Sequence, residues 1–310
     1  MADLSDLEEQ ALIRLMKREA EYERYVAATL RQALNEIRVE MSKIYEKYAV
    51  DGILSKANMT RYNRYTAMES NIIKRLDPAV RANLATIKRL TPEQYEAAFF
   101  EAAWAIDNTS GLRLNWGIIN TDAIKAAFAI DDPANIYMSE ALKRYSIEAR
   151  RQIRMALNNG LAQGKSYTAM MKDIKDALNK TNYEAMRIIR TEGQGAISAG
   201  TADAYDRALE DGVDGSMVWS STLDDRTRDQ HRDMDGQVRD ADGLFHFPNG
   251  ETAPYPCWEG LSAENRINCR CKIRMEIAGY SPQLRRTRDQ GVIPYQTYGD
   301  WEEEYGPILH

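Results

Sequence analysis

The stretch "YERYVAATLRQALNEIRVEMSKIYEKY", residues 22–48, determines what kind of fold this chain forms. Its apolar residues recur every three or four positions, which is the period of an α-helix with one buried face. The whole segment from Ser5 to Tyr48 contains no Gly or Pro that would interrupt a helix. It therefore predicts a helix of about 44 residues, whose apolar face packs either in a bundle of this chain or against another chain.

Caps and helix breakers predict where the helices begin and end. Ser5-x-x-Glu8 forms a capping box at the start of the first helix, and Asp51-Gly52 marks its end. Further helices follow up to about residue 135, and later ones are expected at 138–160, 166–179 and 181–210. The predicted breaks in the first part lie at Asp77-Pro78, Thr91-Pro92, Asn108 to Gly111 and Asp132-Pro133.

The character of the sequence changes after Gly212. Short alternating stretches predict strands, and "LDDRTRDQHRDM" (223–234) predicts a short charged helix. The last thirty residues contain three Pro and several aromatics without a clear period, which favours an extended tail. The expected fold is α+β and mostly α: a long helical N-terminal part, a small α+β module with a short antiparallel sheet, and an extended C-terminal tail. The expected strands are "SMVWSS" (216–221), "GLFHFPNG" with its turn (243–250) and "CRCKIRMEI" (269–277).

The composition limits the classes of function. The net charge of −6 provides no overall attraction to nucleic acid or anionic membranes. No run of about 18 apolar residues occurs, and the N-terminus lacks the pattern of a secretory signal, so we expect a chain made in a cytoplasm and not held by a membrane. An odd number of cysteines, three, fits a reducing compartment.

Charged residues in a helix of small side chains form a first candidate site. Arg190 and Glu192 lie in "RIIRTEGQGAISAG" (187–200), where Gly and Ala allow another element to approach closely. They could belong to an active site. A buried ion pair that fixes this helix to the module is the interpretation we favour.

A second candidate is the charged helix itself. Arg228 and His231 are three residues apart and would share a helix face, with Asp224 and Asp225 in its first turn. A His beside Arg and Asp can act as a general acid or base, as a metal ligand or as a polar contact. An enzyme built here would be a nuclease-like hydrolase using His231, Arg228 and Glu192.

The stretch "INCRC" (267–271) forms the third candidate. Cysteines one residue apart on a regular strand point to opposite faces, but at a turn or strand start both can reach one ion. Cys257, Cys269 and Cys271 with His231 would make a Cys3His set, which suits structural zinc. A structural role without metal, and redox or disulfide chemistry, remain alternatives. Asn268 could fasten a turn, and Arg270 could pair with Asp224, Asp225 or Glu192.

Taken in order, these motifs resemble the phage Mu F-like family, the minor head or head morphogenesis proteins of tailed bacteriophages. The resemblance covers about residues 140 to 277. The stretch "APYPCWEG" stands where the family usually has a Pro-Gly-Asp-Pro-like segment, so Cys257 is particular to this chain. The motifs are Arg190-Thr191-Glu192, Trp219-Ser220, Asp225-Arg226-Thr227-Arg228-x-x-His231-x-x-x-Asp235-Gly236, Phe245 or Phe247, and Asn268-Cys269-Arg270-Cys271.

The resemblance implies a virion component without enzymatic activity that acts in head assembly and in DNA packaging or ejection. It implies binding to the portal protein, with the major capsid or scaffolding protein and phage DNA as further partners, and a place in the head interior or at the portal vertex after assembly in the host cytoplasm. We expect residues 1–135 to contact portal or capsid, 136–278 to form the module and 279–310 the tail. Some relatives carry a C-terminal toxin or ADP-ribosyltransferase domain, for which the tail is too short.

Within the module we expect a structural latch, meaning polar residues that hold its elements together. A DNA-binding assembly factor is a further alternative, with basic clusters at Lys143-Arg144, Arg150-Arg151, and Arg285-Arg286 plus Arg288. The latch residues are Arg190, Glu192, Trp219, Asp225, Arg226, Arg228, His231, Asn268 and Arg270.

Overall fold

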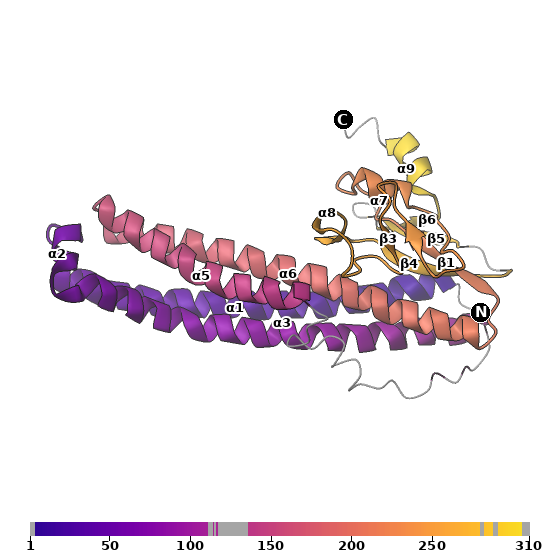
Figure 1. The fold of residues 1–310 in the computed structure, drawn as a ribbon, viewed down its shortest axis with the longest axis horizontal. Coiled ribbons are helices and arrows are strands. Elements are labelled where there is room, and N and C mark those ends of the chain that lie inside the picture. The colour runs from indigo at the N-terminus through magenta and orange to yellow at the C-terminus, as the bar shows by residue number, and fades with distance from the viewer. Residues whose placement is uncertain are drawn as a thin grey trace. The chain divides into compact units, whose positions relative to one another are not determined.

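The computed structural model describes residues 4–110, 114, 116, 136–279, 282–287 and 291–305. The fold is mostly α with some β, as predicted (Figure 1). The helices are α1 (Leu4–Tyr48), α2 (Lys56–Thr60), the 3-10 turn η1 (Arg61–Asn63), α3 (Arg64–Ser110), α5 (Ile136–Ala162), α6 (Tyr167–Glu210), α7 (Asp229–Asp233), α8 (Ala263–Arg266) and α9 (Tyr298–Tyr305). The strands are β1 (Gly215–Ser220), β2 (Phe245–His246), β3 (Thr252–Ala253), β4 (Lys272–Ile277), β5 (Leu284–Thr287) and β6 (Gly291–Pro294).

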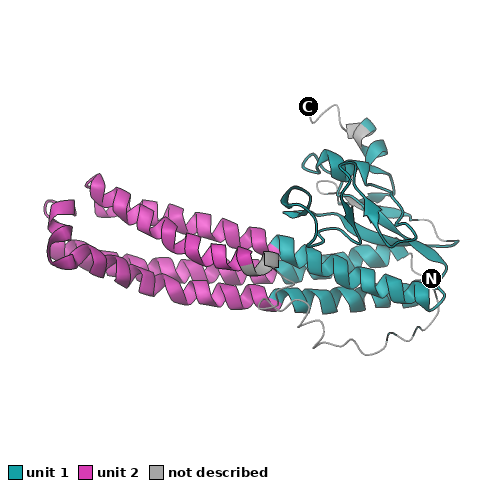
Figure 2. Ribbon diagram, in the orientation of Figure 1, with its two compact units in different colours: residues 1–19, 90–132, 190–310 teal, residues 20–89, 133–189 magenta. Residues whose placement is uncertain are grey.

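The chain divides into two compact units (Figure 2). Unit 1 comprises residues 1–19, 90–132 and 190–310, and unit 2 comprises 20–89 and 133–189. Helices α1, α3 and α6 each contribute one segment to each unit. The functional boundaries at residues 135 and 278 stay predictions.

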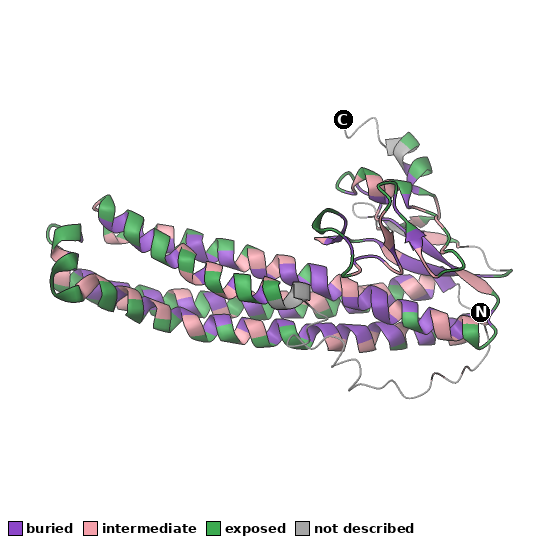
Figure 3. Cartoon of the chain, viewed as in Figure 1, coloured by how far each residue is buried: buried purple, intermediate pink, exposed green. Residues whose placement is uncertain are grey.

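The first helix has the predicted extent. It runs from Leu4 to Tyr48, and most of its apolar positions are buried, with Met16, Tyr25 and Val39 as exposed exceptions (Figure 3). The capping box, however, was wrong, because Ser5 already lies inside the helix. Its Oγ accepts hydrogen bonds from the backbone N–H groups of Gln283 and Leu284, each at 3.3 Å. The start of α1 is therefore held by the C-terminal part of the chain.

Two predicted breaks within α3 and one near Thr181 do not occur. Helix α3 continues through Pro78 and Pro92, and α6 continues through Thr181, whose hydroxyl donates to the carbonyl of Ala177 at 3.0 Å. A Pro inside a helix removes one backbone hydrogen bond and disfavours the helical conformation of the residue before it. Buried apolar residues in the same turns outweigh this local cost.

Unit 2 consists of helical segments that lie side by side; α2 lies in the connection between α1 and α3, and α5 and α6 are joined by a separate turn (Figures 1 and 2). Its core contains a polar network among the apolar residues: Thr29 and Asn83 are hydrogen-bonded, and Asn83 donates to the hydroxyl of Tyr145 at 3.0 Å. Such buried polar contacts fix which helix faces meet, because any other pairing would leave them unsatisfied.

Unit 1 contains the predicted short antiparallel sheet. Strand β1 pairs with β4, with Trp219 opposite Ile273 and Met217 opposite Met275, and all four side chains are buried. Strand β2 pairs with β3, and β5 pairs with β6. Helix α6 approaches α3 closely at Gly200, where an added Cβ would lie 2.2 Å from the carbonyl oxygen of Tyr95. A glycine is required at this contact.

The C-terminal segment contains more structure than the predicted extended tail. It forms the β5–β6 hairpin and helix α9. Tyr298 and Trp301 of α9 are buried and pack with Leu223 of the module. The aromatic residues that gave no clear period therefore act as anchors. Within the described residues, no helix is long and apolar enough to cross a membrane.

Candidate metal centre and polar latch

The candidate site lies where α7 and the residues just before β4 meet. Trp219 of β1 is fully buried and packs edge-on against Phe245 and Phe247, with ring centroids 5.3 Å away in both cases. His231 of α7 lies against the same aromatic rings, 5.5 Å from that of Phe247. The site is therefore built into the hydrophobic core of unit 1.

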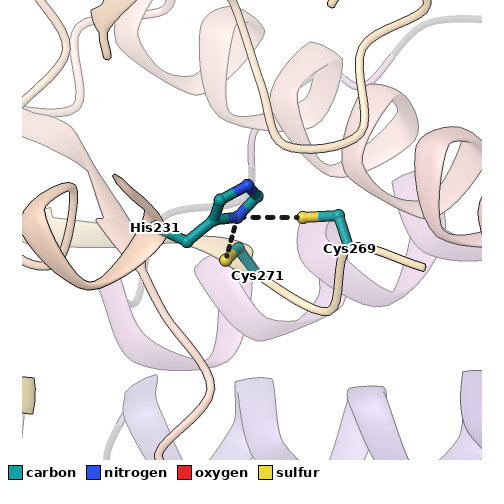
Figure 4. Close-up of side chains that lie close together, drawn as sticks. All are labelled: His231, Cys269 and Cys271. Atoms are coloured by element: carbon teal, nitrogen blue, oxygen red, sulfur yellow. Dashed lines mark hydrogen bonds between the residues drawn. The ribbon is translucent and has the colours of Figure 1, made fainter. Parts of the chain in front are cut away.

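Three residues with metal-binding side chains converge there (Figure 4). His231 Nδ1 lies 3.2 Å from Cys271 Sγ and 3.6 Å from Cys269 Sγ. The three ligand atoms all lie within 4.8 Å of one another, and all three residues are buried. The hydrogen bond with Cys257 and burial raise the pKa of Cys269 well above its usual range, and burial does the same for Cys271. These are neutral thiols in the absence of a metal.

Both cysteines can reach one point because they precede the strand. Strand β4 begins at Lys272, so the side chains of Cys269 and Cys271 need not alternate between opposite faces as they would within a strand. Asn268 adopts a left-handed backbone conformation with φ 54°, a conformation that Asn tolerates better than most residues. The turn therefore comes from the backbone of Asn268; its side chain is exposed.

Cys257 does not join the cluster as predicted. It is buried, and its Sγ donates to the carbonyl oxygens of Arg266 at 3.3 Å and Cys269 at 3.5 Å. It lies beside Cys269 but outside the group of three. Its backbone also has a left-handed conformation, with φ 62°, and its carbonyl would lie 3.1 Å from a Cβ at Gly195 of α6.

The latch around α7 involves Asp224 and Arg270. Arg270 donates two hydrogen bonds to the fully buried Asp224 carboxylate, and Thr227 donates a third. Burial raises the pKa of Asp224, but the bonds from Arg270 and Thr227 outweigh it and hold this pKa below its ordinary value of 3.8. Of the three partners foreseen for Arg270, the structure selects this one.

The remaining predicted latch residues take separate places. Glu192 forms a buried ion pair with Arg266 of α8 at 2.6 Å, a partner that the sequence did not indicate, and its role in fixing α6 to the module stays a prediction. Arg228 donates to the carbonyl of Ile267. Asp225 and Arg226 are exposed and precede α7, which begins only at Asp229, and Arg190 is exposed on α6.

Several further contacts hold these segments together, and the sequence gave no specific signal for them. Thr191 accepts a hydrogen bond from the backbone of Asn268 at 3.1 Å, and Gln194 donates to the carbonyl of Cys271 at 3.0 Å. Asp235 and Arg285 form an ion pair whose side chains are only 3% and 4% exposed. Asp235 belongs to the Asp-Gly pair after α7, whereas Arg285 had been grouped with basic surface residues.

His231, Cys269 and Cys271 form a group that could hold a metal ion. The carboxylate of Glu192 is engaged by Arg266, and His231 faces two thiols inside the core. Two described cavities, of about 400 and 700 Å³, are lined by other residues. Glu192, Arg228 and His231, the three groups considered for hydrolysis, therefore each contact a different partner.

Comparisons with known proteins agree with the motifs. The family model described as phage Mu protein F like protein matches residues 151–274. Minor head protein GP7 of Bacillus phage SPP1 is 27% identical over 276 residues, covering 87% of this chain and 88% of that protein. NAD(+)–arginine ADP-ribosyltransferase EFV of Enterococcus faecalis is 28% identical over 218 residues, which cover 70% of this chain but only 44% of the relative. An uncharacterized protein, YqbB of Bacillus subtilis, is 28% identical over 144 residues, covering 44% of this chain and 46% of YqbB. No solved structure matches.

Proposed function

We propose that this chain is a minor structural protein of a bacteriophage head. Its residues 151–274 match the family model described as phage Mu protein F like protein. The observation that carries the proposal is the similarity to minor head protein GP7 along most of both chains. The packing of the module supports it, because its charged groups pair with one another in the interior, as in a rigid platform for assembly.

In more detail, the protein attaches to the portal and acts in head assembly and in DNA packaging or ejection. It is made in the host cytoplasm and ends in the head interior or at the portal vertex. Residues 1–135 provide the surface for portal, major capsid or scaffolding protein. Large apolar side chains exposed around the turn after α1 support this, among them Val50 at 65% and Tyr62 at 87% exposed.

The test is co-expression with the portal protein of the same phage, followed by size-exclusion chromatography and analysis of procapsids. Val50→Asp with Tyr62→Asp should weaken co-elution and incorporation at least tenfold, because both charges would have to be desolvated in an interface. Arg61→Ala, an exposed neighbour, is the matched control. A wild-type chain that stays monomeric beside the portal and is absent from procapsids contradicts the attachment.

We also propose that the protein has no enzymatic activity and, in particular, is not a nuclease, although one relative is named as an ADP-ribosyltransferase. Supporting this, His231 is 2% and Glu192 is 6% exposed. Nuclease assays on RNA and DNA should give no turnover above buffer. Turnover that disappears in His231→Ala, while circular dichroism and incorporation into heads stay unchanged, would establish the hydrolase instead.

The alternative of a DNA-binding assembly factor has weaker support. Arg285 is buried in its pair with Asp235, and Arg150 and Arg151 pair with Asp77 and Glu148. Lys143 and Arg144 are exposed and remain available, and Arg288 lies outside the described residues. A steep fall in affinity for duplex DNA with rising salt, reduced by Lys143→Ala with Arg144→Ala, would favour this alternative.

A further inference from the structure

The histidine-cysteine cluster leads to an inference that is independent of the role in the head. A buried imidazole normally satisfies its nitrogens with separate partners. In His231, a single nitrogen, Nδ1, faces both Cys269 Sγ and Cys271 Sγ, at 3.6 and 3.2 Å. The one lone pair of Nδ1 can accept one proton from one thiol. A metal ion between the three atoms would satisfy all of them at once.

The distances fit such an ion. Zinc binds Cys sulfur at about 2.3 Å and His nitrogen at about 2.0–2.1 Å in a tetrahedral arrangement, which places the ligand atoms about 3.5–3.8 Å from one another. The distance from Nδ1 to Cys269 Sγ, 3.6 Å, lies in that range, and the distance to Cys271 Sγ, 3.2 Å, lies below it. Two sulfur ligands with one imidazole are also the chemistry that favours zinc over magnesium or calcium, which prefer oxygen.

The other side of the imidazole ring agrees with this assignment. Nε2 of His231 is buried, and no hydrogen-bond partner for it exists among the described residues. The ring meets Trp219 and Phe247 in T-shaped geometry, an arrangement in which an N–H group can point to an aromatic face. A proton on Nε2 would leave the lone pair of Nδ1 facing the two sulfur atoms.

We propose that His231, Cys269 and Cys271 bind a zinc ion, and that Cys257 supplies the fourth ligand after a rotation of its side chain. Structural zinc sites are four-coordinate and closed to water. The four residues are 1–3% exposed, and the Cys257 thiol already contacts Cys269. The ion connects α7, the turn before β4 and the segment before α8, three elements whose own secondary structure is short.

The first experiment measures the zinc content of the full-length chain, purified without a histidine tag and dialysed against metal-free buffer. We expect about one zinc ion per chain in the wild type and in His246→Ala, and at least a tenfold loss in His231→Ala. His246 is the matched control, because it is a mostly exposed histidine paired with Asp240. Removing zinc with a strong chelator should lower the melting temperature of the wild type. Wild-type protein with no bound zinc, and a melting temperature that zinc and chelator leave unchanged, overturn the proposal even if the variants do not fold.

The second experiment replaces zinc by cobalt(II) in the wild type and counts the sulfur ligands. The near-ultraviolet charge-transfer band from thiolate to cobalt grows with the number of bound thiolates. Cys257→Ser should reduce this band by about one third, from three thiolates to two, and weaken zinc binding by 10-fold or more. An unchanged band and affinity in Cys257→Ser would overturn the assignment of the fourth ligand and leave a three-residue site.

Discussion

The buried ion pair between Arg285 and Asp235 gives the most direct test of how the C-terminal hairpin is held. Arg285 on β5 donates to both carboxylate oxygens of Asp235, to the carbonyl of Gln296 at 2.8 Å and to the carbonyl of Ser221. Both side chains are almost fully buried. Arg285→Ala leaves the Asp235 carboxylate buried without its cation, and loss of one partner of a buried pair costs about 3–5 kcal/mol.

Asp235 takes part in as many hydrogen bonds as Arg285, four each. Besides those from Arg285, it accepts hydrogen bonds from the backbone N–H of Ser221 at 2.8 Å and of Tyr298 at 2.7 Å. Asp235→Ala should therefore cost at least as much as Arg285→Ala, and the double variant should cost about the same as Asp235→Ala alone. The two effects are not additive, because both variants break one network.

Urea unfolding followed by tryptophan fluorescence and circular dichroism measures these differences in the free energy of unfolding. Arg226→Ala is the control: this arginine is exposed in the same module, and its loss should change stability by no more than about 0.5 kcal/mol. A cost for Arg285→Ala similar to that of the control, or full additivity in the double variant, would show that the hairpin is not held by this pair.

Two further predictions concern the packing and titration of unit 1. Gly200→Ala should lower stability by about 1–3 kcal/mol, because its Cβ would overlap the backbone of Tyr95. Gly193→Ala should cost less or be stabilising, because its Cβ would meet only side-chain atoms, the carboxylate of Glu19 at 3.2 Å and Leu90 Cδ2 at 3.5 Å; thermal melting compares the two variants. Burial raises the pKa of Glu8 above 4.5. The contribution of protonated Glu8 to the free energy of unfolding is therefore fully present below about pH 4.5 and is lost as the pH rises through the raised pKa. Glu8→Gln should thus be more stable than wild type at pH 7, and an advantage that fails to shrink toward pH 4 would contradict the stated cause.

The elements that could be predicted from the sequence are those whose pattern extends over many turns. The extent of α1 followed from its long apolar period and the absence of Gly and Pro. The breaks at Pro78 and Pro92 were wrong, because a breaker acts on one turn whereas burial acts along the whole of α3. Local signals were thus overruled wherever long-range packing was strong.

The candidate site, too, could be predicted from the sequence only in part. The charged and sulfur-containing residues could be found by type and spacing, and the suggested Cys3His set already placed His231 beside Cys269 and Cys271. The sequence left three partners open for Arg270 and gave no sign that Glu192 pairs with Arg266, because both choices depend on the three-dimensional arrangement. The position of Cys257 depends on a left-handed backbone that no spacing rule indicates.

The contact between the two ends of the chain has a consequence for the time course of synthesis. Glu9 near the start of α1 pairs with Lys272, and the neighbouring Glu8 accepts from the backbone of Met275 at 3.1 Å. The partners are 263 and 267 residues apart in the chain, so at roughly 5–20 residues per second the ribosome needs on the order of 10–50 s to deliver them. During that time the first turns of α1 remain without their binding site on β4. Anything that reaches that surface earlier, a chaperone or a neighbouring nascent chain, competes directly with completion of unit 1.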